Sequence, residues 1–363
     1  MLSYVIRRLL LMVPTLLGIT AVVFFVMALS PGGVGGNLVD GDGQIESAQA
    51  QALREYYDRR YGLDQPKAVQ YLRWLNRVSP IGFATEASAE GETLGAFGFK
   101  VPDLGESFSK GRPVLDLYGE ALPITLLLNA ITTPLAYLVA IWTGTYAARY
   151  RGKAFDVVSG TGLLGLWSIP TIWAGVLMIG FFANEQYPAL RLFPTSGLSS
   201  IGAESMAFLP SFGGEAGFER GWLLDRLWHL ALPVICLTYG SFAVLSKLMR
   251  AAVLDNISAD FVRTARAKGL SGRVVLWRHA FRNSLLPLIT VAAGLIPSLL
   301  AGSLIVERIF SIPGMGQLMI EAIYARDREL VLAGTLLGGL ISLICILIAD
   351  LCYAVADPRV SYD

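Results

Sequence analysis

Long apolar runs dominate the chain, and polar residues gather between these runs rather than alternating with them. A helix needs about 20 consecutive apolar residues to cross the hydrocarbon core of a bilayer. Runs of this kind lie at about residues 9–29, 122–148, 157–183, 230–246, 284–306 and 330–349. The pattern predicts an all-α membrane protein with six transmembrane helices.

The first apolar run follows Arg7 and Arg8, as the hydrophobic part of a signal peptide would. At about 21 residues, it is longer than the 7 to 15 residues typical of such a segment. We therefore expect residues 1–30 to form a retained helix. The predicted order is then an outer region at 31–121, a core of five helices at 122–356 and a tail at 357–363.

Composition supports the membrane class, because apolar residues make up 54% of the chain, charged residues only 16%, and the mean hydropathy is +0.56. The three cysteines, Cys236, Cys345 and Cys352, all lie in or beside apolar runs. This placement supports neither a disulfide framework nor a zinc site. We expect no metal site in the chain.

The positions of Lys and Arg predict the orientation. Basic residues precede the first run, fill the connection 149–153 after the second run, and open the connection after the fourth run at Lys247 and Arg250. If the helices alternate in direction, these sites share one side, which the positive-inside rule assigns to the cytoplasm. The rule predicts cytoplasmic N- and C-termini and outward-facing loops at 31–121 and 184–229.

Within the outer region, the stretch "KAVQYLRWLNRV" places Val69, Leu72 and Leu75 at helical spacing and predicts a helix. Residues 80–102 are small, polar and rich in glycine, which indicates an insertion or a mobile loop. The loop at 184–229 has a similar character.

The first five apolar runs contain no Asp, Glu, Lys, Arg or His in their interiors, and His229 only precedes the fourth. Ion-coupled carriers usually need such a group to bind or relay the ion. The pattern therefore disfavours a secondary carrier, which stays open as an alternative. Asp350, near the end of the last run, is expected to be an interfacial carboxylate that reaches water or a neighbour.

Prolines and small polar residues mark a candidate translocation path. An interior proline frees a backbone carbonyl, so kinked helices tend to line the inside of a bundle. The predicted path residues are Asn129, Thr132, Thr133, Pro134, Pro170 and Pro297.

No motif in the chain predicts catalysis or nucleotide binding. The phosphate-binding pattern G-x-x-x-x-G-K-[ST] is absent, as are H-E-x-x-H and G-x-S-x-G. A single S-x-x-K lies at Ser107 to Lys110, without companion motifs. An intramembrane enzyme is disfavoured because no nucleophile and base are predicted at one depth. Energy for transport would then have to come from a partner.

The basic segment between the fourth and fifth runs predicts a helical elbow. An amphipathic helix is expected from Asp255 to Lys268, capped by Asp255 or Asn256 and stopped by Gly269 in a left-handed conformation. Ser271 can cap a second helix that reaches Pro287. The small residues Ala265, Ala267 and Gly269 would let a partner approach the tip, although contact with anionic lipid is an alternative.

The stretch "RTARAKG" at 263–269, followed by "HAFRNSLLP" at 279–287, resembles the coupling loop of permease subunits in binding-protein-dependent ABC importers of the dipeptide and oligopeptide branch. Further similar motifs occur in order along the chain: "IRRLLLMVPTLLGIT" near the start, "DLGESFSKGRPV" at 103–114 and "ERIFSIPGMG" at 307–316. The resemblance covers nearly the whole chain. It implies the type I ABC importer permease fold.

The resemblance also implies partners: a second permease, two ABC ATPase subunits that use ATP and magnesium, an extracytoplasmic solute-binding protein and the lipid bilayer, with no nucleic acid. The chain itself would bind no cofactor. Within the cytoplasmic loop 250–283, the implied ATPase-coupling residues are Arg263, Thr264, Ala265, Arg266, Ala267, Lys268, Gly269 and Arg273. Arg263 and Thr264 replace the Glu and Ala usual in the family.

The expected function is therefore inward transport of peptides across the bacterial inner membrane, driven by ATP hydrolysis on partner subunits. Related permeases take nickel, glutathione or oligosaccharides, so a non-peptide solute is an alternative. The insertions near 80–102 and 199–222 resemble the subgroup associated with microcin C and related peptides.

Overall fold

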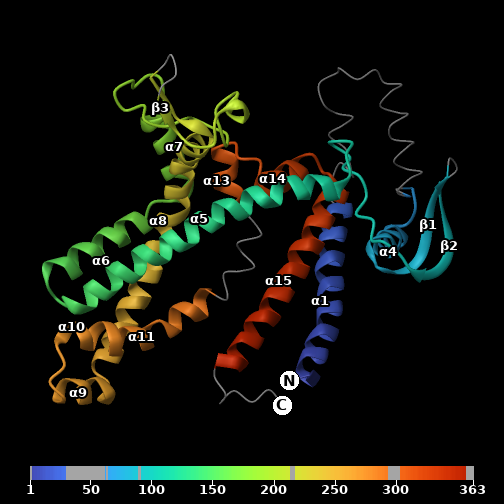
Figure 1. The fold of residues 1–363 in the computed structure, drawn as a ribbon. Helices are drawn as coiled ribbons and strands as arrows, with labels where there is room; N and C mark the ends of the chain where they lie inside the picture. Colours follow the sequence, from blue (N-terminus) through green and yellow to red (C-terminus); the bar gives the residue numbers. More distant parts are fainter. Residues whose placement is uncertain are drawn as a thin grey trace. The chain divides into compact units, whose positions relative to one another are not determined.

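The computed structural model describes residues 2–29, 62, 64–88, 91–212, 217–292 and 303–356 (Figure 1). The chain divides into two compact units. The first combines Met1–Ala121 with Leu318–Asp363, and the second comprises Leu122–Gln317.

Within the part of the chain that the structure describes, four helices are long and apolar enough to cross a membrane, which confirms a helical membrane protein with several apolar helices. These helices are α1 (Leu2–Leu29), α5 (Val114–Arg149), α8 (Gly221–Ile257) and α15 (Arg328–Ala356). They contain four of the predicted runs. The predicted run 284–306 lies partly outside the described residues, because 293–302 are not described.

The third predicted run forms two helices rather than one. Helix α6 (Ala154–Trp167) and helix α7 (Thr171–Phe182) meet at an angle of 91°. Pro170 explains the break, because proline lacks an N–H donor and disfavours helical geometry at the preceding residue. Counted as one broken span, the pair brings the total to five.

In the first unit, α1 packs along α15, and α4 (Lys67–Val78) lies beside α1 (Figure 1). The helix predicted from "KAVQYLRWLNRV" is confirmed. The mobile loop predicted at 80–102 is wrong, since this segment forms an antiparallel hairpin of β1 (Ile81–Ser88) and β2 (Gly91–Phe99). Phe83 pairs with Phe97 across the strands, and aromatic cross-strand pairs of this kind stabilise a hairpin despite its glycines.

In the second unit, α6 and α7 pack against α8. A buried apolar cluster of this unit includes Leu128 on α5, Leu230 on α8 and Phe310, the C-terminal cap of α13 (Leu304–Ile309). The loop before α8 contains a short 3₁₀ turn (Ala203–Ser205) and a small hairpin of β3 (Ser211–Phe212) and β4 (Phe218–Glu219). Helix α14 (Met315–Tyr324) links the unit to the rest of the chain.

Candidate functional site

The predicted elbow is present, but its first helix begins later than expected. Helix α8 continues to Ile257, and α9 spans Asp260–Ala267 after an extended Ala259. The predicted cap at Asp255 or Asn256 is wrong, because both residues lie in the last turn of α8. The Asn256 amide instead donates to the carbonyl of Ala252 at 2.8 Å.

Gly269 stops α9 in the predicted left-handed conformation, with φ of +79°. Its N–H donates to the Arg266 carbonyl at 2.9 Å. The chain then continues as α10 (Gly272–Val274), a π-helical turn (Val275–Ala280) and α11 (Phe281–Ser284). Ser271 occupies the N-cap position of α10 but makes no side-chain capping bond. The elbow is therefore two helical arms joined at a glycine.

A small apolar core holds the two arms together. Val262 and Ala265 from α9 pack against Val275 and Ala280 from the second arm. Ala265 thus faces inward and is 5% exposed, which corrects the prediction that it lies on the surface of the tip. The remaining predicted coupling residues are exposed: Arg263, Thr264, Arg266, Ala267, Lys268, Gly269 and Arg273.

The exposed face of the elbow is strongly basic. Arg263 lies 3.5 Å from Asp260, in a solvent-exposed pair. Among the residues that the structure describes, Arg266, Lys268 and Arg273 make no ion pair. Uncompensated positive charge around Ala267 and Gly269 suits an acidic surface of a partner.

The elbow is also anchored to the end of α8. Met249 and Val253 on α8 pack with Leu276 from the second arm. The Ser284 hydroxyl donates to the Ala252 carbonyl at 3.0 Å. These contacts fix the elbow to the C-terminal end of α8.

A second contact ties α8 to the start of α6. Arg250 donates to both carboxylate oxygens of Asp156, at 2.6 and 2.8 Å, and the Gly152 N–H donates to the same carboxylate at 2.9 Å. This pair was not predicted, because the basic residues after the second and fourth apolar runs indicated only orientation.

The predicted path residues are not all brought together. Asn129, Thr132 and Thr133 lie on one face of α5, where Thr132 is buried and Asn129 donates to the Thr125 carbonyl at 3.0 Å. Pro134 is exposed, and Pro170 stands at the start of α7. Pro297 lies outside the described residues. The translocation path stays a prediction.

A serine, a histidine and a carboxylate meet where the 184–229 loop folds back onto α8. The Ser200 hydroxyl donates to Asp225 at 2.6 Å and lies 3.3 Å from His229 Nε2. Ser200 and His229 both lie outside the predicted apolar runs, so the expectation that no nucleophile and base share a depth inside the membrane stays a prediction. The arrangement differs from a catalytic triad, in which the carboxylate orients the histidine. Here Asp225 contacts the serine, and its Oδ1 lies 3.9 Å from His229 Nε2. The cluster fastens the loop to the helix.

Three consecutive charged residues, Asp327, Arg328 and Glu329, are fully buried at the start of α15. Arg328 donates to Glu329 Oε1 at 2.8 Å and to Gln70 Oε1 at 3.0 Å. Arg77 pairs with the other oxygen of Glu329. Two guanidinium groups thus share one carboxylate inside the first unit, and they join α4 to α15.

The "DLGESFS" segment completes this buried network. Asp327 accepts hydrogen bonds from the Ser107 hydroxyl at 2.5 Å and from the N–H and hydroxyl of Ser109, each at 2.9 Å. Ser107 is therefore a structural residue, and the S-x-x-K spacing is not a nucleophile motif here. Gly105 has φ of +79°, and a Cβ there would lie 3.0 Å from Glu329. The positive φ and the short distance to Glu329 explain why glycine occupies position 105.

A comparable buried carboxylate organises the "ERIFSIPGMG" segment of the second unit. Glu307 accepts from the backbone N–H groups of Ser303, Gly316 and Gln317 at 2.7 to 3.0 Å. Burial raises the pKa of Glu307 above its usual value, although these hydrogen bonds act in the opposite direction. At Gly314 and Gly316, a Cβ would collide with Glu307.

Asp350, the carboxylate near the end of the last apolar run, accepts a hydrogen bond from Tyr4 at 2.7 Å and pairs with Arg8 at 2.9 Å. The expected contact with a neighbour is confirmed, and the interfacial position stays a prediction. The pair links the starting turn of α1 to α15.

Family models match almost the entire chain. The model for the binding-protein-dependent transport system inner membrane component matches residues 140–362, and the model for the N-terminal part of such membrane components matches residues 1–129. The chain belongs to this permease family. The elbow lies within the match to residues 140–362.

Several curated relatives align with this permease from end to end. The oligopeptide transport system permease protein AppB of Bacillus subtilis is 34% identical, with full coverage of both chains. The di/tripeptide permease protein DppB of Pseudomonas aeruginosa is 32% identical, again with full coverage. The inner membrane ABC transporter permease protein YejB of Escherichia coli O157:H7 is 31% identical and covers 99% of each chain.

One solved structure, an inward-facing MetNI methionine ABC transporter, aligns with a TM-score of 0.48 and 15% identity over 67% of the permease and 97% of that chain. The similar identities to AppB, DppB and YejB do not separate one subgroup from another. Assignment to the microcin C subgroup stays a prediction.

The Asp156–Arg250 contact of this permease yields a first expected result. Asp156→Asn should lower the free energy of unfolding by about 1 kcal/mol, since Arg250 is partly exposed and solvent weakens the pair. The control is Asp255→Asn, which removes an exposed carboxylate from α8, the helix that carries Arg250. Thermal unfolding of the purified variants measures the difference, and equal midpoints would show that the pair contributes nothing.

Proposed function

We propose that the chain is the permease subunit of an ATP-driven ABC importer for peptides or related small solutes in the bacterial cytoplasmic membrane. The observation that supports this proposal most strongly is the elbow. Its two arms pack on each other, its exposed face is basic, and it is fixed to α8. The chain that contains it aligns end to end with peptide permeases. The proposal includes the type I fold, six membrane crossings and cytoplasmic N- and C-termini.

The proposed partners follow from two features of the chain: its sequence contains no nucleotide-binding motif, and its elbow presents an exposed basic face. Two ATPase subunits would dock on the exposed face of the elbow and hydrolyse ATP with magnesium. A second permease would complete the translocation path, and an extracytoplasmic solute-binding protein would deliver the solute. Relatives named for oligopeptides and for di- and tripeptides support peptides as the solute class.

Charge reversal on the elbow tests the proposed docking. The tagged chain is extracted gently from its native membrane, and co-purifying proteins are identified by mass spectrometry. We expect ATPase subunits and a second permease to be recovered with the native chain. Reversing Arg266, Lys268 and Arg273 to Glu should reduce ATPase recovery at least tenfold while the second permease remains, because like charges across an interface repel.

Arg191→Glu is the matched control, since Arg191 is an exposed arginine in the 184–229 loop and far from the elbow in sequence. ATPase recovery should be unchanged in this variant. Recovery of ATPase subunits at native levels from the elbow variant would reject the proposed coupling surface. Purification of the native chain alone, under conditions that preserve other importers, would reject the importer itself.

A further inference from the structure

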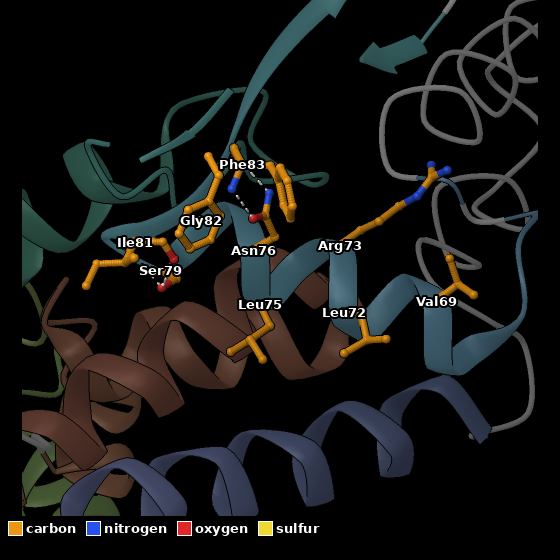
Figure 2. Close-up of a pocket in the computed structure, with 10 residues that line it drawn as sticks. Val69, Leu72, Arg73, Leu75, Asn76, Ser79, Ile81, Gly82 and Phe83 are labelled. Carbon is orange, nitrogen blue, oxygen red and sulfur yellow. Dashed lines mark hydrogen bonds between the residues drawn. The ribbon is translucent and has the colours of Figure 1, made fainter. Parts of the chain in front are cut away.

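A groove of about 600 Å³ lies between α4 and the β1–β2 hairpin (Figure 2). Its volume falls within the range of about 300 to 1,000 Å³ that is common for sites binding small molecules. Apolar side chains form most of its lining: Val69, Leu72, Leu75, Ile81, Phe83 and Phe97. None of the residues assigned to transport lines this groove.

The apolar side of α4 faces this groove because the opposite side of the helix is already occupied. Gln70, Trp74 and Arg77 are buried, and they include the partners of Arg328 and Glu329. Leu72 is left 60% exposed and Phe97 67% exposed. A contiguous apolar surface of this kind usually marks a site that something apolar covers.

Contacts with α1 place α4 beside the C-terminal half of that apolar helix. The Tyr71 hydroxyl donates to the Leu17 carbonyl and lies 3.1 Å from the Thr20 hydroxyl, and the Tyr71 ring lies 5.3 Å from that of Phe24. The 26-residue apolar part of α1 is about 39 Å long, against a hydrocarbon thickness of about 30 Å. The Tyr71 ring therefore lies beside the middle and C-terminal half of α1, within the length of that helix that hydrocarbon can cover.

The polar positions of α4 carry positive charge and no negative charge. Lys67 and Arg73 are exposed, and within the described residues neither makes a hydrogen bond or an ion pair. Figure 2 shows Val69, Leu72 and Leu75 projecting from one side of α4 and the Arg73 guanidinium from another. A helix with an apolar side, basic polar positions and aromatic residues is typical of the membrane interface.

We infer that the groove between α4 and the hairpin binds anionic phospholipid in the leaflet reached by the C-terminal end of α1. An acyl chain lies against Leu72, Phe83 and Phe97, and the headgroup phosphate meets Lys67 and Arg73. The site anchors the outer region on the bilayer next to α1. The inference depends on membrane insertion of α1 and not on the solute that the permease carries.

Spin labels on the full chain test the acyl-chain site. Leu72→Cys is labelled after Cys236, Cys345 and Cys352 are replaced by Ala, and the chain is placed in nanodiscs of equimolar phosphatidylglycerol and phosphatidylcholine. Collisions with oxygen, which concentrates in hydrocarbon, are compared with collisions with a water-soluble nickel chelate. References are Val26→Cys, on an exposed position of α1, and Arg263→Cys, in the basic elbow.

We expect the label at position 72 to favour oxygen, as the label at position 26 does. A label at position 72 that favours the nickel chelate, as the label at position 263 does, would overturn the inference. A label shielded from both reagents would show that protein covers the groove, which would overturn it as well.

Lipid retention tests the headgroup contacts without cysteine replacement. Native mass spectrometry of the otherwise unmodified chain measures bound phosphatidylglycerol relative to phosphatidylcholine. Lys67→Glu and Arg73→Glu should each lower this ratio at least fivefold, since one basic residue near an anionic surface contributes about 1 kcal/mol. Arg191→Glu should leave the ratio unchanged. Equal ratios in all variants would overturn the assignment of an anionic headgroup.

Discussion

Replacing Glu329 by Gln is expected to destabilise the first unit by about 3 to 5 kcal/mol, the usual cost of breaking a buried ion pair. The Glu329 side chain is fully buried and is shared by Arg77 and Arg328, which are themselves almost fully buried. A neutral amide would leave two guanidinium groups without their counter-charge. The thermal midpoint of the purified chain and its level in the membrane measure the loss.

Glu120→Gln makes the same chemical change in a pair that is exposed. Glu120 accepts two hydrogen bonds from Arg112, and both side chains are open to solvent. Water compensates for the loss of such a contact, so the midpoint should hardly move. If the two substitutions lowered the thermal midpoint equally, the contribution of Glu329 to stability would not come from its burial.

Gly269→Pro is expected to abolish ATP-driven transport while leaving the chain inserted in the membrane. Proline fixes φ near −65°, whereas Gly269 has φ of +79° and donates its N–H to the Arg266 carbonyl. A cost of about 3 kcal/mol or more leaves roughly one native elbow in 100. ATP-dependent peptide uptake by the reconstituted importer should therefore fall well over tenfold.

Gly272→Pro provides the matched control, three positions along the same elbow. Gly272 is the first residue of α10, a position where proline is favoured, and the preceding Ser271 is extended with ψ of 146°. This variant should keep near-native uptake and ATPase recovery. Native uptake by the Gly269→Pro variant would exclude a need for the left-handed corner in coupling.

Features set by neighbouring residues were predictable from the sequence. The apolar runs predicted α1, α5, α8 and α15, because the requirement for about 20 apolar residues is local. The same holds for the left-handed stop at Gly269, which follows from the conformational freedom of glycine at the end of a helix. The family resemblance then rested on short motifs whose order along the chain could be read directly.

Features that depend on distant partners were not predictable. Periodicity predicted the helix α4 but not its buried side, since Gln70 and Arg77 are buried because their partners lie on α15. Likewise, Ser200 and His229 meet only because a loop folds back onto α8. The β1–β2 hairpin at 81–99 was not predicted either. Its small and glycine-rich sequence gave no pattern from which the pairing of the two strands could be derived.

The separation of Arg77 and Glu329 along the chain has a consequence for biosynthesis. The two residues are 252 positions apart, and ribosomes add about 5 to 20 residues each second. For about 13 to 50 s, α4 is therefore made without its carboxylate partner. A nascent or truncated chain exposes an uncompensated arginine and an unclosed first unit, and completion of α15 is the event that closes it. Proteases that survey the membrane could distinguish unfinished permeases from finished ones on this basis.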